Sequence, residues 1–194
     1  MKFKIIKHDK VSSTNDVAIE LIKKKKFSFG CVNARIQEKG RGTSGNKWIS
    51  LEGNLFCTIF FPLKNKFPKF NEFSIINPVI ISDVIKKFCV SKKINLKFPN
   101  DIFVNGKKMC GILQEVISQD QENFLIIGIG INIVDSPEIK ENYKATNILT
   151  ETGKKPNIRH IISQIIISYE DFFQNIQNYD YFYFKEKANS MSLN

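Results

Sequence analysis

The sequence lacks several features that would each point to a class of protein. It has no run of about 20 apolar residues, the length that a membrane-spanning helix needs, and its N-terminus lacks the apolar core of a signal peptide. Its two histidines, His8 and His160, lie in no catalytic motif, which disfavours a hydrolase with a histidine base. The four cysteines form no Cys-x-x-Cys pair, so neither a zinc site nor a disulfide framework is indicated. We therefore expect a cytoplasmic protein that binds no membrane.

The charge of the chain points to an anionic partner. The 194 residues carry a net charge of +10, which favours a nucleotide, an acidic protein or a nucleic acid. The lysines are spread along the chain, and the run at 23–26 is typical of the solvated end of a helix. A non-catalytic nucleic-acid-binding protein stays open, but it would need exposed aromatic residues among the basic ones. Most aromatic residues here fall at spacings typical of a core.

The order of apolar patterns predicts an α+β fold, a mixed and largely antiparallel sheet flanked by helices. Strands are expected at 3–8, 30–36, 54–61 and 124–134, with two more in 95–115 around a turn. Helices are expected at 13–25, 73–88 and 157–184, and Pro78 should open or kink the second. No repeat, linker or internal boundary is visible, so residues 1–194 are expected to form a single domain.

The dipeptide Asn105-Gly106 is a strong signal for a two-residue hairpin turn. Such a turn places Phe103 opposite Lys108 and Asp101 opposite Cys110, so all four share one face of the hairpin. The long side chain of Lys108 can then reach the Asp101 carboxylate or its ligand. Taken alone, this pattern is an ordinary cross-strand ion pair worth ~0.2–1 kcal/mol.

The stretch Gly40–Gly45 reads GRGTSG and fits the dinucleotide-binding pattern G-x-G-x-x-G. That pattern needs a helix directly after the loop, and residues 46–54 cannot sustain one. The phosphate-binding P-loop pattern fails as well, because Asn46-Lys47-Trp48 follows where Lys-Ser/Thr is required. The loop must therefore serve another purpose.

Four blocks of sequence together resemble the biotin–protein ligases. KFPNDIFVNGKKMCGILQE at 97–115 is similar to the family signature K-W-P-N-D…K-x-x-G-I-L-x-E, and QEKGRGTSGNKW at 37–48 resembles its Q-x-x-G-R-G-x-x-G-x-x-W loop. SSTN at 12–15 and GIGIN at 128–132 resemble two further blocks, and all four follow the family's order. The resemblance covers most of the chain and implies the class II synthetase-like biotin/lipoate ligase fold.

The resemblance also implies a two-step reaction with ATP, Mg²⁺ and biotin. Biotin is first converted to biotinyl-AMP, and its acyl group then passes to a lysine on the biotin carboxyl carrier domain of a carboxylase. The glycine loop becomes a lid that orders over the labile intermediate. A lipoate or octanoate ligase or transferase of the same superfamily is the nearest alternative, although its R-x-S-G-G-G-type loop is absent.

Each predicted site residue follows from this resemblance. The implied biotin contacts are Ser13, Thr14, Asn15, Gln37, Gly40, Arg41, Gly42, Thr43, Lys108 and Gly111. The implied ATP contacts are Arg41, Trp48, Asn100, Lys108 and Asn132. Lys108, Arg41 and Asp101 are the predicted catalytic residues, because phosphoryl transfer depends on positioning and charge neutralisation. Asp101 is also the predicted Mg²⁺ ligand.

The chain departs from the family pattern in places. Thr43 stands where a second arginine is common, which predicts weaker retention of the adenylate unless Lys47 compensates. Phe98 replaces a tryptophan, and Cys110 stands where glycine or alanine is common. We expect no N-terminal winged-helix domain, hence no DNA binding, and no C-terminal SH3-like domain, hence weaker ATP binding. A homodimer formed through sheet edges stays open.

Overall fold

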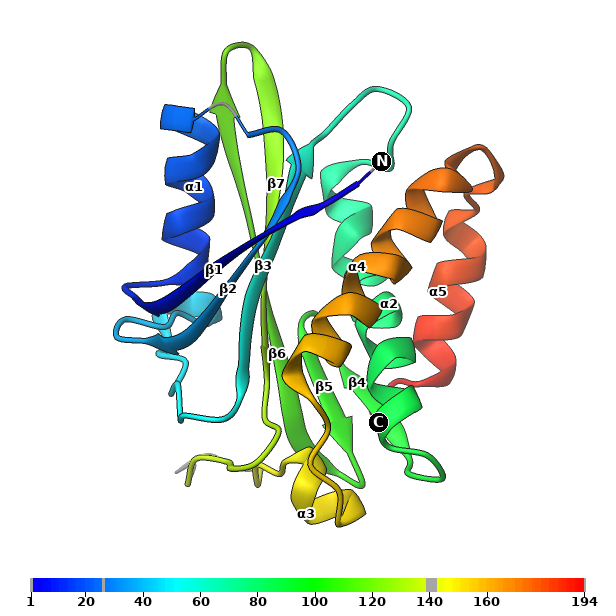
Figure 1. The fold of residues 1–194 in the computed structure, drawn as a ribbon. Coiled ribbons are helices and arrows are strands. Elements are labelled where there is room, and N and C mark those ends of the chain that lie inside the picture. Colours follow the sequence, from blue (N-terminus) through cyan, green and yellow to red (C-terminus); the bar gives the residue numbers. More distant parts are fainter. Residues whose placement is uncertain (1, 26, 139–142, 194) are drawn as a thin grey trace.

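The computed structural model describes residues 2–25, 27–138 and 143–193. Its strands form one seven-stranded sheet in the order β1-β2-β3-β7-β6-β5-β4 (Figure 1). Its strands are β1 (Lys4–Val11), β2 (Gly30–Gln37), β3 (Leu55–Pro62), β4 (Ile94–Lys97), β5 (Asp101–Val104), β6 (Lys107–Gln119) and β7 (Glu122–Ile131). Strands β1 and β2 run parallel, and each other neighbouring pair is antiparallel. This confirms the predicted α+β class and the largely antiparallel sheet.

Helices cover the two faces of the sheet unequally. They are α1 (Thr14–Lys25), α2 (Phe73–Phe88), α3 (Ile148–Thr152), α4 (Ile158–Gln174) and α5 (Tyr181–Ser190). Helix α1 lies alone on one face, α2 and α4 pack on the other, and α5 packs on α2 (Figure 1). No helix in the described ranges is both long and apolar enough to cross a membrane.

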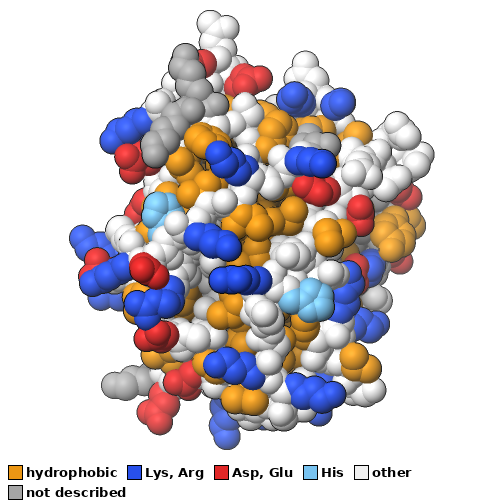
Figure 2. Space-filling model, viewed as in Figure 1, with side chains coloured by type: hydrophobic (Ala, Val, Ile, Leu, Met, Phe, Trp, Pro, Cys, Tyr) orange, Lys and Arg blue, Asp and Glu red, His pale blue; other side chains and the backbone are white. Residues whose placement is uncertain are grey.

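The main apolar core lies between the sheet and helices α2 and α4, because every second residue of the central strands points there. Aromatic rings meet in this core, as their spacing predicted: Phe3, Phe61, Phe67, Phe73 and Phe173. A smaller cluster lies under α1. On the face seen in Figure 2, lysine and arginine side chains are scattered rather than gathered in one patch.

One helix prediction needs correction. The single helix predicted over 157–184 is two helices, because α4 ends at Gln174 and the Asp180 side chain accepts a hydrogen bond from Phe182 N to begin α5. Pro78 lies inside α2 and does not open it, since the helix begins at Phe73. The short helix α3 was not predicted.

The predicted hairpin is present, but its register shifts within the strands. Positive φ angles at Asn105 and Gly106 form the turn, and Phe103 faces Lys108 as expected. A bulge next to this pair then places Asp101 opposite Gly111 instead of Cys110. Cys110 therefore points into the main core, and its predicted place beside Asp101 was wrong. The segment before the turn is also two strands, β4 and β5, instead of one.

Candidate active site

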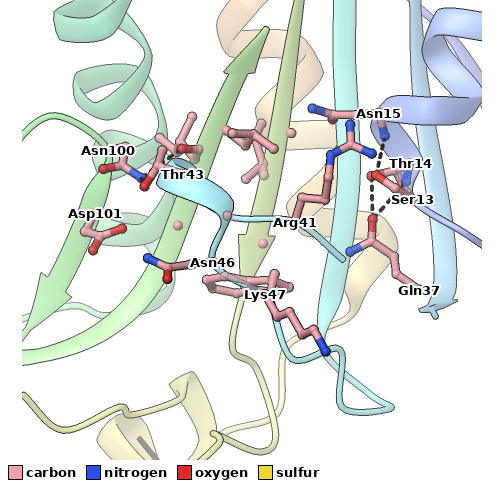
Figure 3. A pocket seen from close by; sticks show the side chains of 18 of the residues that line it. Ser13, Thr14, Asn15, Gln37, Arg41, Thr43, Asn46, Lys47, Asn100 and Asp101 are labelled. Carbon is pink, nitrogen blue, oxygen red and sulfur yellow. Dashed lines mark hydrogen bonds between the residues drawn. The ribbon is translucent and has the colours of Figure 1, made fainter. Parts of the chain in front are cut away.

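A cavity of about 100 Å³ opens on the α1 side of the sheet and brings the four sequence blocks together (Figure 3). The predicted site residues that line it are Ser13, Thr14, Asn15, Gln37, Arg41, Gly42, Thr43, Trp48, Asn100, Asp101, Lys108 and Gly111. The predicted residues Gly40 and Asn132 do not line it. Lining residues that sequence reasoning missed include Asn46, Leu113 and Tyr143.

Glycines on β6 and β7 form the floor of the cavity. A Cβ atom on Gly130 would lie 2.4 Å from the Trp48 ring, and one on Gly111, its partner across the strands, would lie 2.6 Å from it. A Cβ on Gly128 would lie 2.5 Å from Asn15 Oδ1. The earlier residues on this face of β7, Phe124 and Ile126, instead pack under α1. The GIGIN block thus removes side chains where the Trp48 ring and the Asn15 amide approach the sheet.

One end of the cavity is a network of neutral polar groups with fixed directions. Gln37 Oε1 accepts hydrogen bonds from Thr14 N at 2.8 Å and from Thr14 Oγ1 at 3.0 Å. Gln37 Nε2 donates to Ser50 Oγ at 3.2 Å, which fixes the orientation of the amide. The Thr58 hydroxyl, fully buried on β3, donates to Asn15 Oδ1 at 2.6 Å. Such an end suits a neutral ligand that both donates and accepts hydrogen bonds.

The glycine loop closes one side of the cavity as a small hairpin. Gly42 N donates to Asn46 O at 2.7 Å, and Trp48 N donates to Gly40 O at 2.9 Å. Gly40 is buried, and a Cβ atom there would lie 2.5 Å from Trp48 O, so this residue serves the loop's return and lies outside the cavity lining. Thr43, on this loop, accepts a hydrogen bond at Oγ1 from Asn100 Nδ2, which lies 3.4 Å away.

Two carboxylates bind the side chain of Arg41. Its Nη1 donates to Asp16 Oδ1, and its Nη2 donates to both Glu115 oxygens at 3.0 and 3.2 Å. Partial burial alone would lower the pKa of Arg41, but the hydrogen bond to Asp16 and the charge of Glu115 outweigh it and raise the pKa above its ordinary value. The guanidinium therefore stays charged, with its charge matched by these partners.

The other end of the cavity holds an ion pair that is largely shielded from solvent. Lys108 Nζ lies 2.7 Å from Asp101 Oδ2, and the two side chains are 15% and 14% exposed. The ammonium also lies 3.5 Å from the Tyr143 hydroxyl and 5.8 Å from the centre of the Trp48 ring. Burial would lower the pKa of Lys108, but the hydrogen bond and charge of Asp101 raise it. The hairpin thus places a permanent cation at this end.

The second oxygen of Asp101 is suited to a cation. Oδ1 is buried and has no hydrogen-bond partner among the described residues. Those same residues contain no group of three or more His, Cys, Asp or Glu side chains that could form a metal cage. This donor set fits Mg²⁺, which proteins hold through one or two carboxylates while phosphates and water fill its other positions.

Asn132 has a role in the fold instead of a place on the cavity surface. Its Nδ2 donates to Thr146 O at 3.1 Å and its backbone N donates to Met109 O, which ties the end of β7 to the bulge of β6. The side chain is 2% exposed. Neighbouring backbone bonds run from Lys108 N to Lys144 O and from Thr146 N to Lys108 O. They bring Tyr143 against Lys108, a contact that no motif in the sequence signals.

Known proteins resemble this chain in sequence. The sequence model of the Biotin/lipoate A/B protein ligase family matches residues 8–132. The chain belongs to this family. It is 29% identical over 184 residues to the bifunctional ligase/repressor BirA of Bacillus subtilis, covering 91% of this chain but 56% of that protein. It is 30% identical over 125 residues to BirA of Escherichia coli, covering 63% of this chain and 38% of that protein. The chain therefore spans about half the length, or less, of these relatives.

Solved structures of biotin protein ligases share the fold over nearly the whole chain. The enzyme of Aquifex aeolicus in complex with biotin and ATP is 28% identical with a TM-score of 0.80, covering 98% of this chain and 78% of that one. The enzyme of Leishmania major in complex with biotinyl-5-AMP is 26% identical with a TM-score of 0.80, covering 98% and 81%. The chain thus resembles both of these enzymes in three dimensions.

Proposed function

We propose that this chain catalyses ATP-dependent activation of biotin to biotinyl-AMP and transfer of the biotin to a lysine of a biotin carboxyl carrier domain. The observation that carries this proposal is one cavity with a neutral polar network at one end and the Lys108–Asp101 pair at the other. Similar structures hold biotin and ATP or biotinyl-5-AMP, which supports the same assignment.

The neutral end suits the ureido ring of biotin. Ser13 Oγ accepts a hydrogen bond from Asn15 N at 3.2 Å, so its own proton is available to a urea oxygen. Gln37 Oε1 takes the proton of the Thr14 hydroxyl, which leaves the Thr14 oxygen as an acceptor for a urea N–H bond. A neutral urea needs such partners and no counter-charge. Ser13 thus supports the start of α1 and contacts the ligand at the same time.

The charged end suits the reacting atoms. A carboxylate oxygen of biotin attacks the α-phosphorus of ATP, the bond to pyrophosphate breaks, and Lys108 balances negative charge on carboxylate and phosphate oxygens. Mg²⁺, when bound, neutralises charge on the phosphates, and Asp101 Oδ1 would hold it. In the transfer step the acceptor amine attacks the acyl carbon and AMP leaves. The amine must lose a proton, and Asp101 is the carboxylate beside Lys108 that can receive it.

The remaining predicted residues have supporting positions. Trp48 lies on the glycine floor and presents an aromatic face near Lys108, where the adenylate would lie. Asn100 lines the cavity next to Asp101, and Gly42 and Thr43 line it from the loop. Because Asp16 and Glu115 match the charge of Arg41, we assign Arg41 to holding the loop over the ligand. All four cysteines are free, which supports a reducing, cytoplasmic compartment.

ATP–pyrophosphate exchange in the presence of Mg²⁺ tests the proposal, with biotin, lipoate, octanoate or no acid added. We expect exchange with biotin alone. Exchange with lipoate or octanoate instead would assign the chain to the sister activity within the family. Folded protein that exchanges with none of these acids would contradict both assignments.

A further inference from the structure

We propose that Glu115 is a positioning residue that couples the ligand-binding end of the cavity to the glycine loop. The inference rests on the proposed function and assigns a role to a side chain that does not itself line the cavity. One carboxylate, on β6, contacts both the amide that faces the ligand and the arginine that anchors the loop.

The hydrogen bonds around Glu115 form a continuous connection. Its Oε2 accepts from Asn15 Nδ2 at 2.6 Å, and both of its oxygens accept from Arg41 Nη2. Asn15 is 2% exposed, and Thr58 holds its other amide atom, Oδ1. The amide therefore has one orientation, with its N–H groups toward Glu115. Figure 3 shows the Arg41 side chain extending from the loop toward Asn15.

Apart from Arg41, the loop is held to the sheet by a long hydrogen bond from Asn100 Nδ2 to Thr43 Oγ1, at 3.4 Å. Its glycines give the backbone wide freedom, and the bonds between Gly42 and Asn46 and between Gly40 and Trp48 are internal to the loop hairpin. Between described residues, the ion pairs of residues 40–47 all belong to Arg41. Charge-assisted hydrogen bonds are stronger than neutral ones, so Arg41 is the main anchor of the loop to β6 and α1.

Coupling follows because both contacts share one carboxylate. A ligand that contacts the Asn15 amide adds to the contacts that hold Glu115 in place, and so favours the position of Arg41 in which the loop is closed. Linkage is reciprocal, so a closed loop must favour the ligand to the same extent. Asp16 lies next to Asn15, but among the described residues its carboxylate binds Arg41 alone, so it strengthens the anchor without carrying the coupling.

Limited trypsin digestion measures loop opening, because cleavage after Arg41 and Lys47 follows the population of the open form. The proteins are wild type, Glu115→Gln, Asp16→Asn and Asp83→Asn. Asp83 is the control because it binds Lys187 far from the loop. The side chains of Lys187 and Asp83 are 30% and 45% exposed, similar to the 38% and 32% of Arg41 and Glu115. Without ligand we expect Glu115→Gln to be cleaved about tenfold faster than wild type. Asp16→Asn should show a smaller increase, and Asp83→Asn should match wild type.

Saturating biotin then separates coupling from simple anchoring. We expect biotin to slow cleavage of wild type and Asp16→Asn by the same factor, and to give Glu115→Gln little protection. The inference is wrong if Glu115→Gln is cleaved at the wild-type rate without ligand, or if biotin protects this variant as fully as it protects wild type. Arg41→Gln, followed at Lys47, serves as a second variant and should behave like Glu115→Gln. Calorimetry measures biotin binding independently. If the wild type binds no biotin, the proposed function is contradicted. The cleavage rates without ligand still decide whether Glu115 anchors the loop.

Discussion

Lys108 Nζ lies 2.7 Å from Asp101 Oδ2, and this ion pair is more buried than any other between described residues. Burial alone would lower the pKa of Lys108, and Asp101 reverses the sign. The charged form is the form that a carboxylate or phosphate oxygen needs. The pair thus keeps a cation in place at the pH of the cell.

The pH dependence of adenylation follows from this pair. Because the pKa of Lys108 is raised, we expect exchange activity to persist as the pH rises toward the ordinary lysine value of about 10.4. Asp101→Asn leaves the burial and removes the opposing charge, so the pKa must fall and the alkaline limb must move to lower pH. Exchange rates measured from pH 6 to 10.5 show whether the wild-type rate holds across this range and whether the Asp101→Asn rate falls within it. An unchanged alkaline limb in Asp101→Asn would show that Lys108 titration does not set it.

The same pair also contributes to stability in a defined pH window. A pKa raised in the folded state adds stability that is fully present below the pKa of an unfolded lysine and is lost as the pH rises through the folded value. Wild type should therefore lose stability relative to Lys108→Met above about pH 10, and not near pH 7. Urea unfolding at several pH values measures this difference.

Removal of Lys108 should abolish the first half-reaction while the chain still folds. We expect Lys108→Ala to reduce pyrophosphate exchange by about 10²-fold or more, the usual effect of removing a group that stabilises transition-state charge. Lys107→Ala is the matched control, since Lys107 pairs with Glu151 and lies outside the cavity lining. Circular dichroism confirms folding of both. Biotin-dependent exchange at the wild-type rate in Lys108→Ala would remove Lys108 from the mechanism.

The glycine floor predicts a change that a single optical probe reports. Gly130→Ala places a Cβ atom 2.4 Å from the Trp48 ring, so the ring must move off the sheet. Trp48 is the chain's one tryptophan, so its fluorescence emission in Gly130→Ala should lie at longer wavelength than in wild type. The variant should also bind biotin and ATP at least about tenfold more weakly. Gly106→Ala is the control: its Cβ meets nothing within 4 Å, and its φ of +75° costs stability alone. Equal emission spectra for Gly130→Ala and wild type would contradict the role of the floor.

Short-range patterns predicted much of this molecule. The strand at 124–134 and the turn at Asn105-Gly106 were readable because each depends on residues close in the chain. The bulge beside Phe103 was not, since Met109 O there accepts a hydrogen bond from Asn132 N, a residue that is distant in the chain and follows the end of β7. The break between α4 and α5 rests on Asp180, one cap residue within an apolar pattern that continues past it.

The candidate site shows the same division. Residues inside recognisable blocks, such as Asn15 and Lys108, line the cavity as a group. Tyr143 lies in no block and reaches Lys108 only through backbone pairing of residues 144–146. Asp16 and Glu115 stand beside or within blocks, but a sequence does not show that both carboxylates converge on Arg41. Contacts between distant segments depend on the completed fold.

The loop carries Thr43 where a second arginine is common in the family, and this difference predicts how well the intermediate is retained. Thr43 lines the cavity beside Asn100 and adds no charge, and Arg41 is bound by two carboxylates. Lys47 also lines the cavity but is exposed, so Lys108, which is 15% exposed, is the cation expected to face the adenylate. Without an acceptor domain, biotinyl-AMP should escape into solution. Thr43→Arg adds a guanidinium at the cavity mouth, and a hydrogen bond to a charged group is worth about tenfold or more in affinity. We expect the fraction of free biotinyl-AMP to fall by that factor, as measured by rapid filtration after one turnover. Thr43→Lys, with a point charge and no fork, should retain less, and equal release by all three proteins would show that charge at this position does not control retention.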